Sequence, residues 1–161
     1  MMSIGVLAVG RLKNGPEQML LARYEERVVR SAASVGMRFG GIRELPESRA
    51  RDSRKRKHEE TEALFSLAGT ASVIIALDEK GQDLSSHEFA DLLARYRDEG
   101  RRDLFCLVGG ADGLDRALLS RAAQSIRLGR MTWPHQFVRL MVIEQYYRAM
   151  TILAGHPYHR Q

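Results

Sequence analysis

Residues 103–110 read Asp103-Leu104-Phe105-Cys106-Leu107-Val108-Gly109-Gly110, an apolar run that ends in two glycines. Two other runs share this character: residues 4–9, closed by Gly10, and residues 72–77, followed by the polar stretch 78–82. Short apolar runs that do not alternate with polar residues are typical of strands buried on both faces. We expect these three runs to form the centre of a sheet, with a turn at 78–82.

Helices are predicted between these strands. Pro16 suits the first turn of a helix that continues to about residue 34. Ser85 and Glu88 have the spacing of a capping box, which predicts a helix from there to Glu99, stopped by Gly100. The remaining predicted elements are strands at 37–45 and 125–128 and helices at 58–67 and 114–123.

Strands that alternate with helices indicate an α/β fold, a mostly parallel sheet with helices on both faces. A length of 161 residues suits one domain with a single core. Neither a linker nor an internal repeat interrupts the pattern. We therefore expect a single domain over residues 1–161.

The last predicted helix begins near Thr132 and Pro134, continues to about Leu153 and ends at Gly155. Its apolar residues occupy every side rather than one stripe, which indicates burial all round. In a chain this small, one side would cover the sheet and another would meet a second copy. The helix therefore predicts a homodimer.

Composition excludes several classes of protein. The chain is 44% apolar and 28% charged, which is ordinary for a globular domain and unlike a disordered one. No run of about 18 apolar residues predicts a membrane span, and no signal peptide precedes the first strand. Cys106 is the single cysteine, so an internal disulfide is excluded. We expect a cytoplasmic protein that does not engage a membrane.

Positive charge is concentrated in two places. The net charge is +5, and residues 116–161 hold seven arginines against one carboxylate, Glu144. A second basic run covers residues 49–58, which the sequence places in a loop. Arginine offers planar, bidentate contacts to phosphate. We interpret the C-terminal part as facing nucleic acid, and the 49–58 run either as an RNA-contacting loop or as a solvated surface.

Three strand ends are candidate ligand sites, because ligands of open α/β sheets bind beyond the carboxyl ends of the strands. They are Leu77, the glycine loop 109–113 and the stretch 129–134. The glycine loop lacks the dinucleotide fingerprint, and the chain has no Walker motif, nucleophile elbow or metal-binding spacing. The loop on its own is also explained as a tight turn, so the kind of ligand stays open.

The segment Tyr158-His159-Arg160 combines a stacking ring, a titratable imidazole and a guanidinium in three residues. Histidine titrates near neutral pH and can assist the removal of a proton. Residues so close to a terminus are also often frayed and without a role. Composition alone favours the second interpretation.

An ordered series of motifs extends over nearly the whole chain. Its members are Leu77-Asp78-x-x-Gly81, Leu107-Val108-Gly109-Gly110-x-x-Gly113-Leu114, Met131-Thr132-Trp133-Pro134-His135-Gln136-x-Val138-Arg139, Glu144-Gln145-x-Tyr147-Arg148-Ala149 and His156-Pro157-Tyr158-His159-Arg160. The series resembles the RlmH (YbeA-type) ribosomal RNA large subunit methyltransferases of the SPOUT superfamily.

The resemblance implies an activity, a substrate and a topology. The activity is transfer of a methyl group from S-adenosyl-L-methionine to N3 of a pseudouridine in a 23S rRNA stem-loop, on the assembled 70S ribosome. It also implies a homodimer, the absence of a metal, and a deep trefoil knot in the C-terminal part. The alternatives are an RNA-binding α/β module without chemistry, and an enzyme that acts on a small phosphorylated metabolite.

The resemblance also implies site residues. The methyl donor would be held by Leu77, Gly110, Gly129, Arg130, Met131, Thr132, Trp133 and Pro134, with Arg130 contributing only its backbone. The target nucleotide would be served by His159 and Arg160, with Tyr158 able to stack on a base. Arg139 and Arg148 are weaker candidates, and Arg148 could instead pair with Glu144 one helical turn away.

Overall fold

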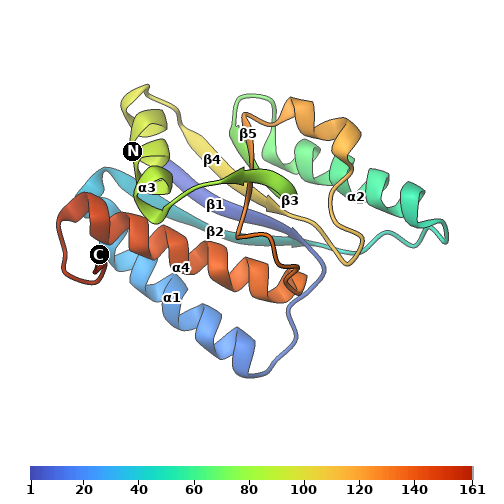
Figure 1. The fold of residues 1–161 in the computed structure, drawn as a ribbon, viewed down its shortest axis with the longest axis horizontal. Helices are drawn as coiled ribbons and strands as arrows, with labels where there is room; N and C mark the ends of the chain where they lie inside the picture. Colours follow the sequence, from blue (N-terminus) through green and yellow to red (C-terminus); the bar gives the residue numbers. More distant parts are fainter. Residues whose placement is uncertain (161) are drawn as a thin grey trace.

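A computed structural model describes residues 1–160, and its centre is a five-stranded sheet in the order β2-β1-β4-β3-β5 (Figure 1). Every neighbouring pair of strands is parallel. The strands are β1 (Met2–Val9), β2 (Met37–Leu45), β3 (Val73–Asp83), β4 (Asp103–Val108) and β5 (Gln124–Arg127). The predicted parallel α/β fold is confirmed.

Helices cover both faces of the sheet. They are α1 (Pro16–Ala32), α2 (Ser53–Ala68), α3 (Ser86–Asp98) and α4 (His135–Ala154), with short 3₁₀ helices η1 (Ala33–Val35) and η2 (Arg116–Arg121). Figure 1 shows α1, α3 and α4 on one face and α2 with η2 on the other. Alternate residues of β1 point to opposite faces of the sheet. Ile4 and Val6 pack with α1, α3 and α4 on one face, whereas Leu7 and Val9 pack with α2 on the other.

Local signals predicted most elements well. The capping box is formed, with the Ser85 side chain accepting from the Glu88 amide and the Glu88 carboxylate accepting from the Ser85 amide. Gly155 ends α4 in the left-handed conformation, at φ +71°, where glycine carries no steric penalty. These ends depend on a few neighbouring residues, which is why the sequence locates them.

Three predicted boundaries are wrong. Residues 78–83 continue β3 instead of forming a turn, because the chain bulges and then pairs with β5 again, so that Ile126 faces both Leu77 and Gln82. Gly81 permits this, since a Cβ there would lie 2.6 Å from the Ile126 carbonyl carbon. Helix α2 begins five residues before the predicted start, and the predicted helix 114–123 is only the 3₁₀ helix η2, which ends before β5.

Helix α4 is anchored to the centre of the sheet by a buried tyrosine. The Tyr146 hydroxyl donates to the Gly5 carbonyl at 2.8 Å and lies 3.2 Å from the Cys106 sulfur, and both side chains are fully buried. Burial raises the pKa of the Cys106 thiol to about 12. Cys106 therefore lies in the core, in agreement with the buried strand predicted for its apolar run.

We expect Cys106 to be inert towards alkylating reagents in the folded protein at pH 8. The thiolate is the reactive form, and a raised pKa together with full burial suppresses it. Mass spectrometry after iodoacetamide treatment should show less than about a tenth of the labelling found in denaturant. Equal labelling rates with and without denaturant would contradict this assignment.

Candidate functional site

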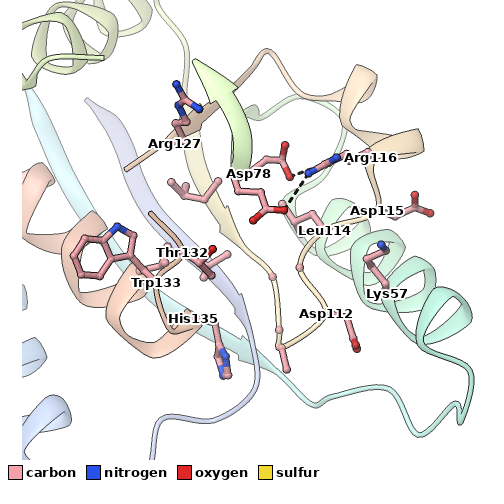
Figure 2. Close-up of a pocket in the computed structure, with 18 of the residues that line it drawn as sticks. Lys57, Asp78, Asp112, Leu114, Asp115, Arg116, Arg127, Thr132, Trp133 and His135 are labelled. Carbon is pink, nitrogen blue, oxygen red and sulfur yellow. Dashed lines mark hydrogen bonds and ion pairs between the residues drawn. The ribbon is translucent and has the colours of Figure 1, made fainter. Parts of the chain in front are cut away.

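A cleft of about 1400 Å³ lies beyond the carboxyl ends of β3, β4 and β5 (Figure 2). Four parts of the chain form its walls. They are residues 77–79 within β3, residues 108–117 from the end of β4, residues 126–129 and 131–135 at and after the end of β5, and the first turns of α2. Ligands of open α/β sheets occupy this position. The cleft is larger than the roughly 300–1,000 Å³ typical of a single small-molecule site.

Seven of the eight residues predicted to hold a methyl donor line this cleft. They are Leu77, Gly110, Gly129, Met131, Thr132, Trp133 and Pro134. Arg130 is not among the lining residues. Two side chains stand open to solvent at the cleft, since Met131 is 77% exposed and Trp133 is 40% exposed. The Trp133 indole donates to the Leu128 carbonyl at 3.0 Å, which holds the 129–134 segment in a closed loop.

The glycine loop is built so tightly that side chains would not fit. A Cβ on Gly109 would lie 2.6 Å from the Gly113 carbonyl carbon, and a Cβ on Gly110 would lie 3.1 Å from the Val9 side chain. The Gly113 amide donates to the Gly110 carbonyl at 3.0 Å. The loop is therefore a tight turn, and it lines the cleft; that it binds a ligand stays a prediction.

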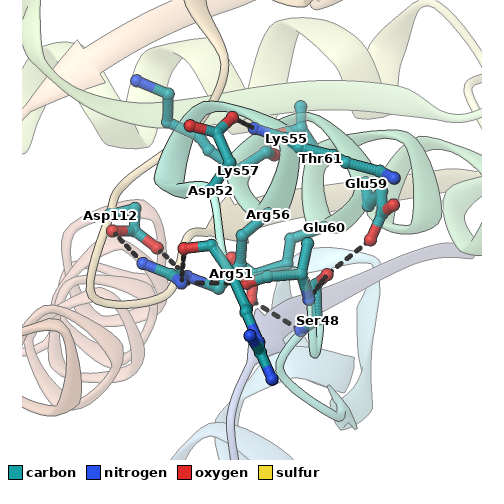
Figure 3. A network of polar contacts seen from close by, with 11 residues as sticks. Ser48, Arg51, Asp52, Lys55, Arg56, Lys57, Glu59, Glu60, Thr61 and Asp112 are labelled. Carbon is teal, nitrogen blue, oxygen red and sulfur yellow. Dashed lines mark hydrogen bonds and ion pairs between the residues drawn. The ribbon is translucent and has the colours of Figure 1, made fainter.

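An arginine on α2 holds the glycine loop from behind. The Arg56 Nε lies 2.6 Å from one Asp112 carboxylate oxygen, and its Nη2 lies 3.0 Å from the other (Figure 3). The same guanidinium donates to the Ala50 carbonyl. These hydrogen bonds hold the pKa of the Asp112 carboxyl below its usual range. The sequence assigned no role to Asp112, because residues 56 positions apart give no local signal.

A second set of contacts joins α2 to the end of this loop. The His58 ring nitrogen Nδ1 lies 2.8 Å from the Asp115 carboxylate, and the Asp115 amide donates to the Thr61 hydroxyl at 2.9 Å. Glu60 lies beneath the loop and is only 5% exposed. Burial raises the pKa of its carboxyl, although one oxygen accepts from the Ser48 amide at 3.0 Å. The loop therefore rests on a polar platform provided by α2.

We expect Arg56→Gln to weaken binding of the methyl donor several-fold by isothermal titration calorimetry, because the loop loses its bidentate contact. Arg30→Gln is the matched control, since Arg30 pairs with Glu26 on the exposed side of α1. Because Arg56 lowers the pKa of Asp112, the contact stabilises the fold above pH about 4 and its effect fades below that value. Equal donor affinity in Arg56→Gln and the wild type would contradict a positioning role.

The predicted catalytic tail lies at the other end of α4. His135 at the start of this 20-residue helix lines the cleft, whereas residues 158–160 fold back from its end and pack on Glu144, Tyr147 and Arg148. No residue of the segment 156–160 lines the cleft. Within one chain, the two halves of the predicted site are therefore not brought together.

Contacts with α4 fix the tail in place. The Tyr158 hydroxyl donates to the Glu144 carboxylate at 3.1 Å, and its ring packs edge-on against Tyr147. Arg148 pairs with Glu144 at 2.7 Å and donates to the His159 ring nitrogen Nδ1 at 3.2 Å. The Glu144–Arg148 pair predicted from the helical spacing is confirmed. The tail is ordered against α4 rather than frayed.

The positive charge of the C-terminal part is mostly neutralised. Five of its seven arginines pair with carboxylates: Arg116 with Asp78 and Glu79, Arg121 with Glu62, Arg127 with Asp83, Arg139 with Glu44, and Arg148 with Glu144. Most of these carboxylates lie earlier in the chain, so a count of charges within residues 116–161 overstates the free positive charge there. That the C-terminal part faces nucleic acid stays a prediction. Arg139 is buried, and its guanidinium also donates to the Val9 and Gly10 carbonyls, so its role is structural.

A parallel α/β domain with a glycine-lined cleft at its strand ends matches a known class of enzyme. A family model described as "Predicted SPOUT methyltransferase" covers residues 2–159. The chain belongs to this SPOUT methyltransferase family, and membership implies a methyl donor. The knot that the family implies stays a prediction for this chain.

Relatives that match at full length carry one common name, Ribosomal RNA large subunit methyltransferase H. The protein of Rhizobium etli (strain CIAT 652) is 53% identical, and that of Agrobacterium fabrum is 49% identical, each over 159 residues and 99% of both chains. Among solved structures, a "Probable Methyltransferase" from Bordetella pertussis Tohama I superposes with a TM-score of 0.50 at 14% identity. It covers 91% of this chain and 95% of its own, and at that identity it supports the fold alone.

Two features are absent from the described part of the chain. Among residues 1–160, no helix is long and apolar enough to cross a bilayer. The same residues contain no group of three histidine, cysteine or carboxylate side chains arranged to hold a metal ion.

Proposed function

We propose that the protein transfers a methyl group from S-adenosyl-L-methionine to N3 of a pseudouridine in 23S rRNA, on the assembled 70S ribosome. The observation that carries this proposal is the cleft, which gathers the glycine loop and the segment 129–134 at one edge of the sheet. Relatives at about 50% identity over the full chain share the corresponding name.

The residues of the cleft fit such a donor. Gly109 and Gly110 both line the cleft, so that part of its wall is main chain without side chains, which a ligand can approach closely. Leu77, Met131 and Trp133 supply apolar surface for a base and a thioether chain. S-adenosylmethionine supplies a methyl group that is already activated on a sulfonium, so a protein nucleophile is not needed. What remains for the chain is to position the acceptor and remove its N3 proton.

We propose a homodimer in which the tail of one chain completes the cleft of its partner. The chain's own tail packs on α4 and contributes no residue to the lining of the cleft, so we take the tail from the second chain. Large apolar side chains stand exposed on α1 and around the start of α4, where a second copy could cover them: Met19, Leu20, Val29, Met131, Trp133 and Phe137.

In the tail, His159 and Arg160 are proposed to serve the target nucleotide, with Tyr158 able to stack on a base. As the ring is held here, Arg148 donates to Nδ1 of His159, so the neutral imidazole carries its hydrogen on Nε2. In that state His159 can donate a hydrogen bond to a base carbonyl. Accepting the N3 proton would require release of the Arg148 contact, which RNA phosphates could cause by competing for the guanidinium.

Positioning should contribute more to the rate than any one side chain. Alignment of reactants can lower a barrier by about 7–11 kcal/mol, whereas a general base contributes about 10²–10⁴-fold. Holding donor and acceptor in one cleft is therefore the main task of the fold.

The direct test is transfer of tritiated methyl groups to 70S ribosomes and to naked 23S rRNA, followed by nucleoside mass spectrometry. The proposal predicts one 3-methylpseudouridine per ribosome and little transfer to naked rRNA. Specific RNA binding without any transfer would favour the non-catalytic module, and methylation of another nucleoside would refute the acceptor.

A further inference from the structure

The first turns of α2 form one wall of the cleft and carry a cluster of cations. Arg54, Lys55 and Lys57 line the cleft on this side. The Asp52 side chain accepts from the Lys55 amide at 2.8 Å and so begins the helix here. Residues 53–58 of the basic run that the sequence placed in a loop are therefore helical, and we name Arg54, Lys55 and Lys57 the α2 edge.

Within residues 1–160, none of the three side chains of the α2 edge is in ion-pair contact with a carboxylate. Their neighbour Arg56 differs, since it is bound to Asp112, and so does His58, which contacts Asp115. Most arginines of the C-terminal part are also paired, as described above. Cleft-lining cations without an ion-pair contact are thus concentrated on the α2 edge, although Lys57 is near enough to Asp112 and Asp115 to lower the pKa of both carboxyls.

The volume of the cleft leaves space next to this edge. About 1400 Å³ exceeds what one small ligand requires, and six of the predicted donor residues come from other elements, at residue 77 in β3 and at residues 129 and 131–134 after β5. A second ligand beside the α2 edge would meet two ammonium groups, a guanidinium and the positive end of the helix dipole. This chemistry suits a chain of phosphates.

We propose that the α2 edge binds the phosphodiester backbone that flanks the target nucleotide and so guides that strand into the cleft. This proposal rests on the proposed function, because the strand is taken to be the rRNA substrate. The Arg56–Asp112 contact connects the two roles, since the same helix turn holds the glycine loop and presents the cations.

The test uses the full-length double variant Lys55→Gln/Lys57→Gln. Its matched control is Arg30→Gln/Arg121→Gln, which removes the same charge from arginines paired with Glu26 and Glu62 outside the cleft. Steady-state methyl transfer to ribosomes is measured at several salt concentrations, and donor affinity is measured by calorimetry. Both variants are checked for folding by thermal melting.

We expect the KM for ribosomes to rise at least tenfold in the α2-edge variant, with kcat and donor affinity within twofold of wild type. The slope of log affinity against log salt should become shallower by about 0.7–0.9 for each phosphate that the variant no longer neutralises. The control should change KM less than twofold. An unchanged KM in the α2-edge variant, or an equal rise of KM in the control, would overturn the proposal. If the α2-edge variant also bound the donor more weakly while its KM for ribosomes stayed unchanged, these lysines would belong to the donor site instead.

Co-sedimentation with ribosomes separates this proposal from the proposed function. If the wild-type protein transfers no methyl group, the proposed function fails, but loss of ribosome binding confined to the α2-edge variant still supports the α2 edge. If wild type is active and both variants co-sediment equally, the α2 edge alone is refuted.

Discussion

Removal of residues 158–161 should reduce methyl transfer to ribosomes by at least a hundredfold while donor binding stays within twofold of wild type. No residue of the segment 156–160 lines the cleft of its own chain, so we expect that chain's donor contacts not to include the tail. A group that assists proton removal contributes about 10²–10⁴-fold to a rate, which sets the expected size of the effect.

His159→Ala separates the chemical role of the tail from its packing. We expect at least a hundredfold lower kcat, with unchanged donor affinity and melting temperature. Tyr158→Phe is the matched control, because it keeps the ring against Tyr147 and removes only the hydroxyl contact with Glu144. Full turnover in His159→Ala would reject the proposed role, and melting of the truncated protein would make the tail structural.

Gly109→Ala should weaken donor binding at least tenfold. Its Cβ would lie 2.6 Å from the Gly113 carbonyl carbon, and backbone cannot move aside as a flexible side chain can, so the loop must shift. Gly15→Ala is the matched control, since its Cβ would meet only the end of the Glu17 side chain, at 3.3 Å, far from the loop in sequence.

The measurement for Gly109→Ala is calorimetric titration with S-adenosylmethionine, with thermal melting to verify folding. Should Gly109→Ala fail to fold, Gly110→Ala is a milder probe, because its Cβ meets the Val9 side chain at 3.1 Å rather than backbone. Wild-type donor affinity in a folded variant of either glycine would show that the donor binds elsewhere.

Local signals explain how much of the fold the sequence predicts. The buried strands, the capping box at Ser85 and the glycine that ends α4 each depend on residues within a few positions. The extension of β3 does not, because it exists only through pairing with β5, about 45 residues later. The true start of α2 does have a local signal, namely Asp52 three residues before Lys55.

The site residues also fall into those that the sequence indicates and those that depend on contacts between distant residues. The resemblance to a known family indicated eight donor-binding residues, namely Leu77, Gly110 and residues 129–134, and seven of these eight line one cleft. The Arg56–Asp112 contact and the pairing of Arg121 with Glu62 join residues more than 50 positions apart, so composition cannot reveal them. That is why the count of C-terminal arginines overstates the free positive charge of that part, and why we propose the α2 edge as a further surface for RNA.

The central claim is that a working site needs the cleft of one chain and the tail of another. Gly109→Ala and the variant lacking residues 158–161 can be co-expressed with different tags and the mixed dimers isolated. They are assayed at a donor concentration too low to saturate Gly109→Ala, where each variant alone has low activity. The account predicts recovery to about half of wild-type methyl transfer, because one of the two sites in each mixed dimer is intact. Purified mixed dimers that remain as inactive as the parent variants would contradict it.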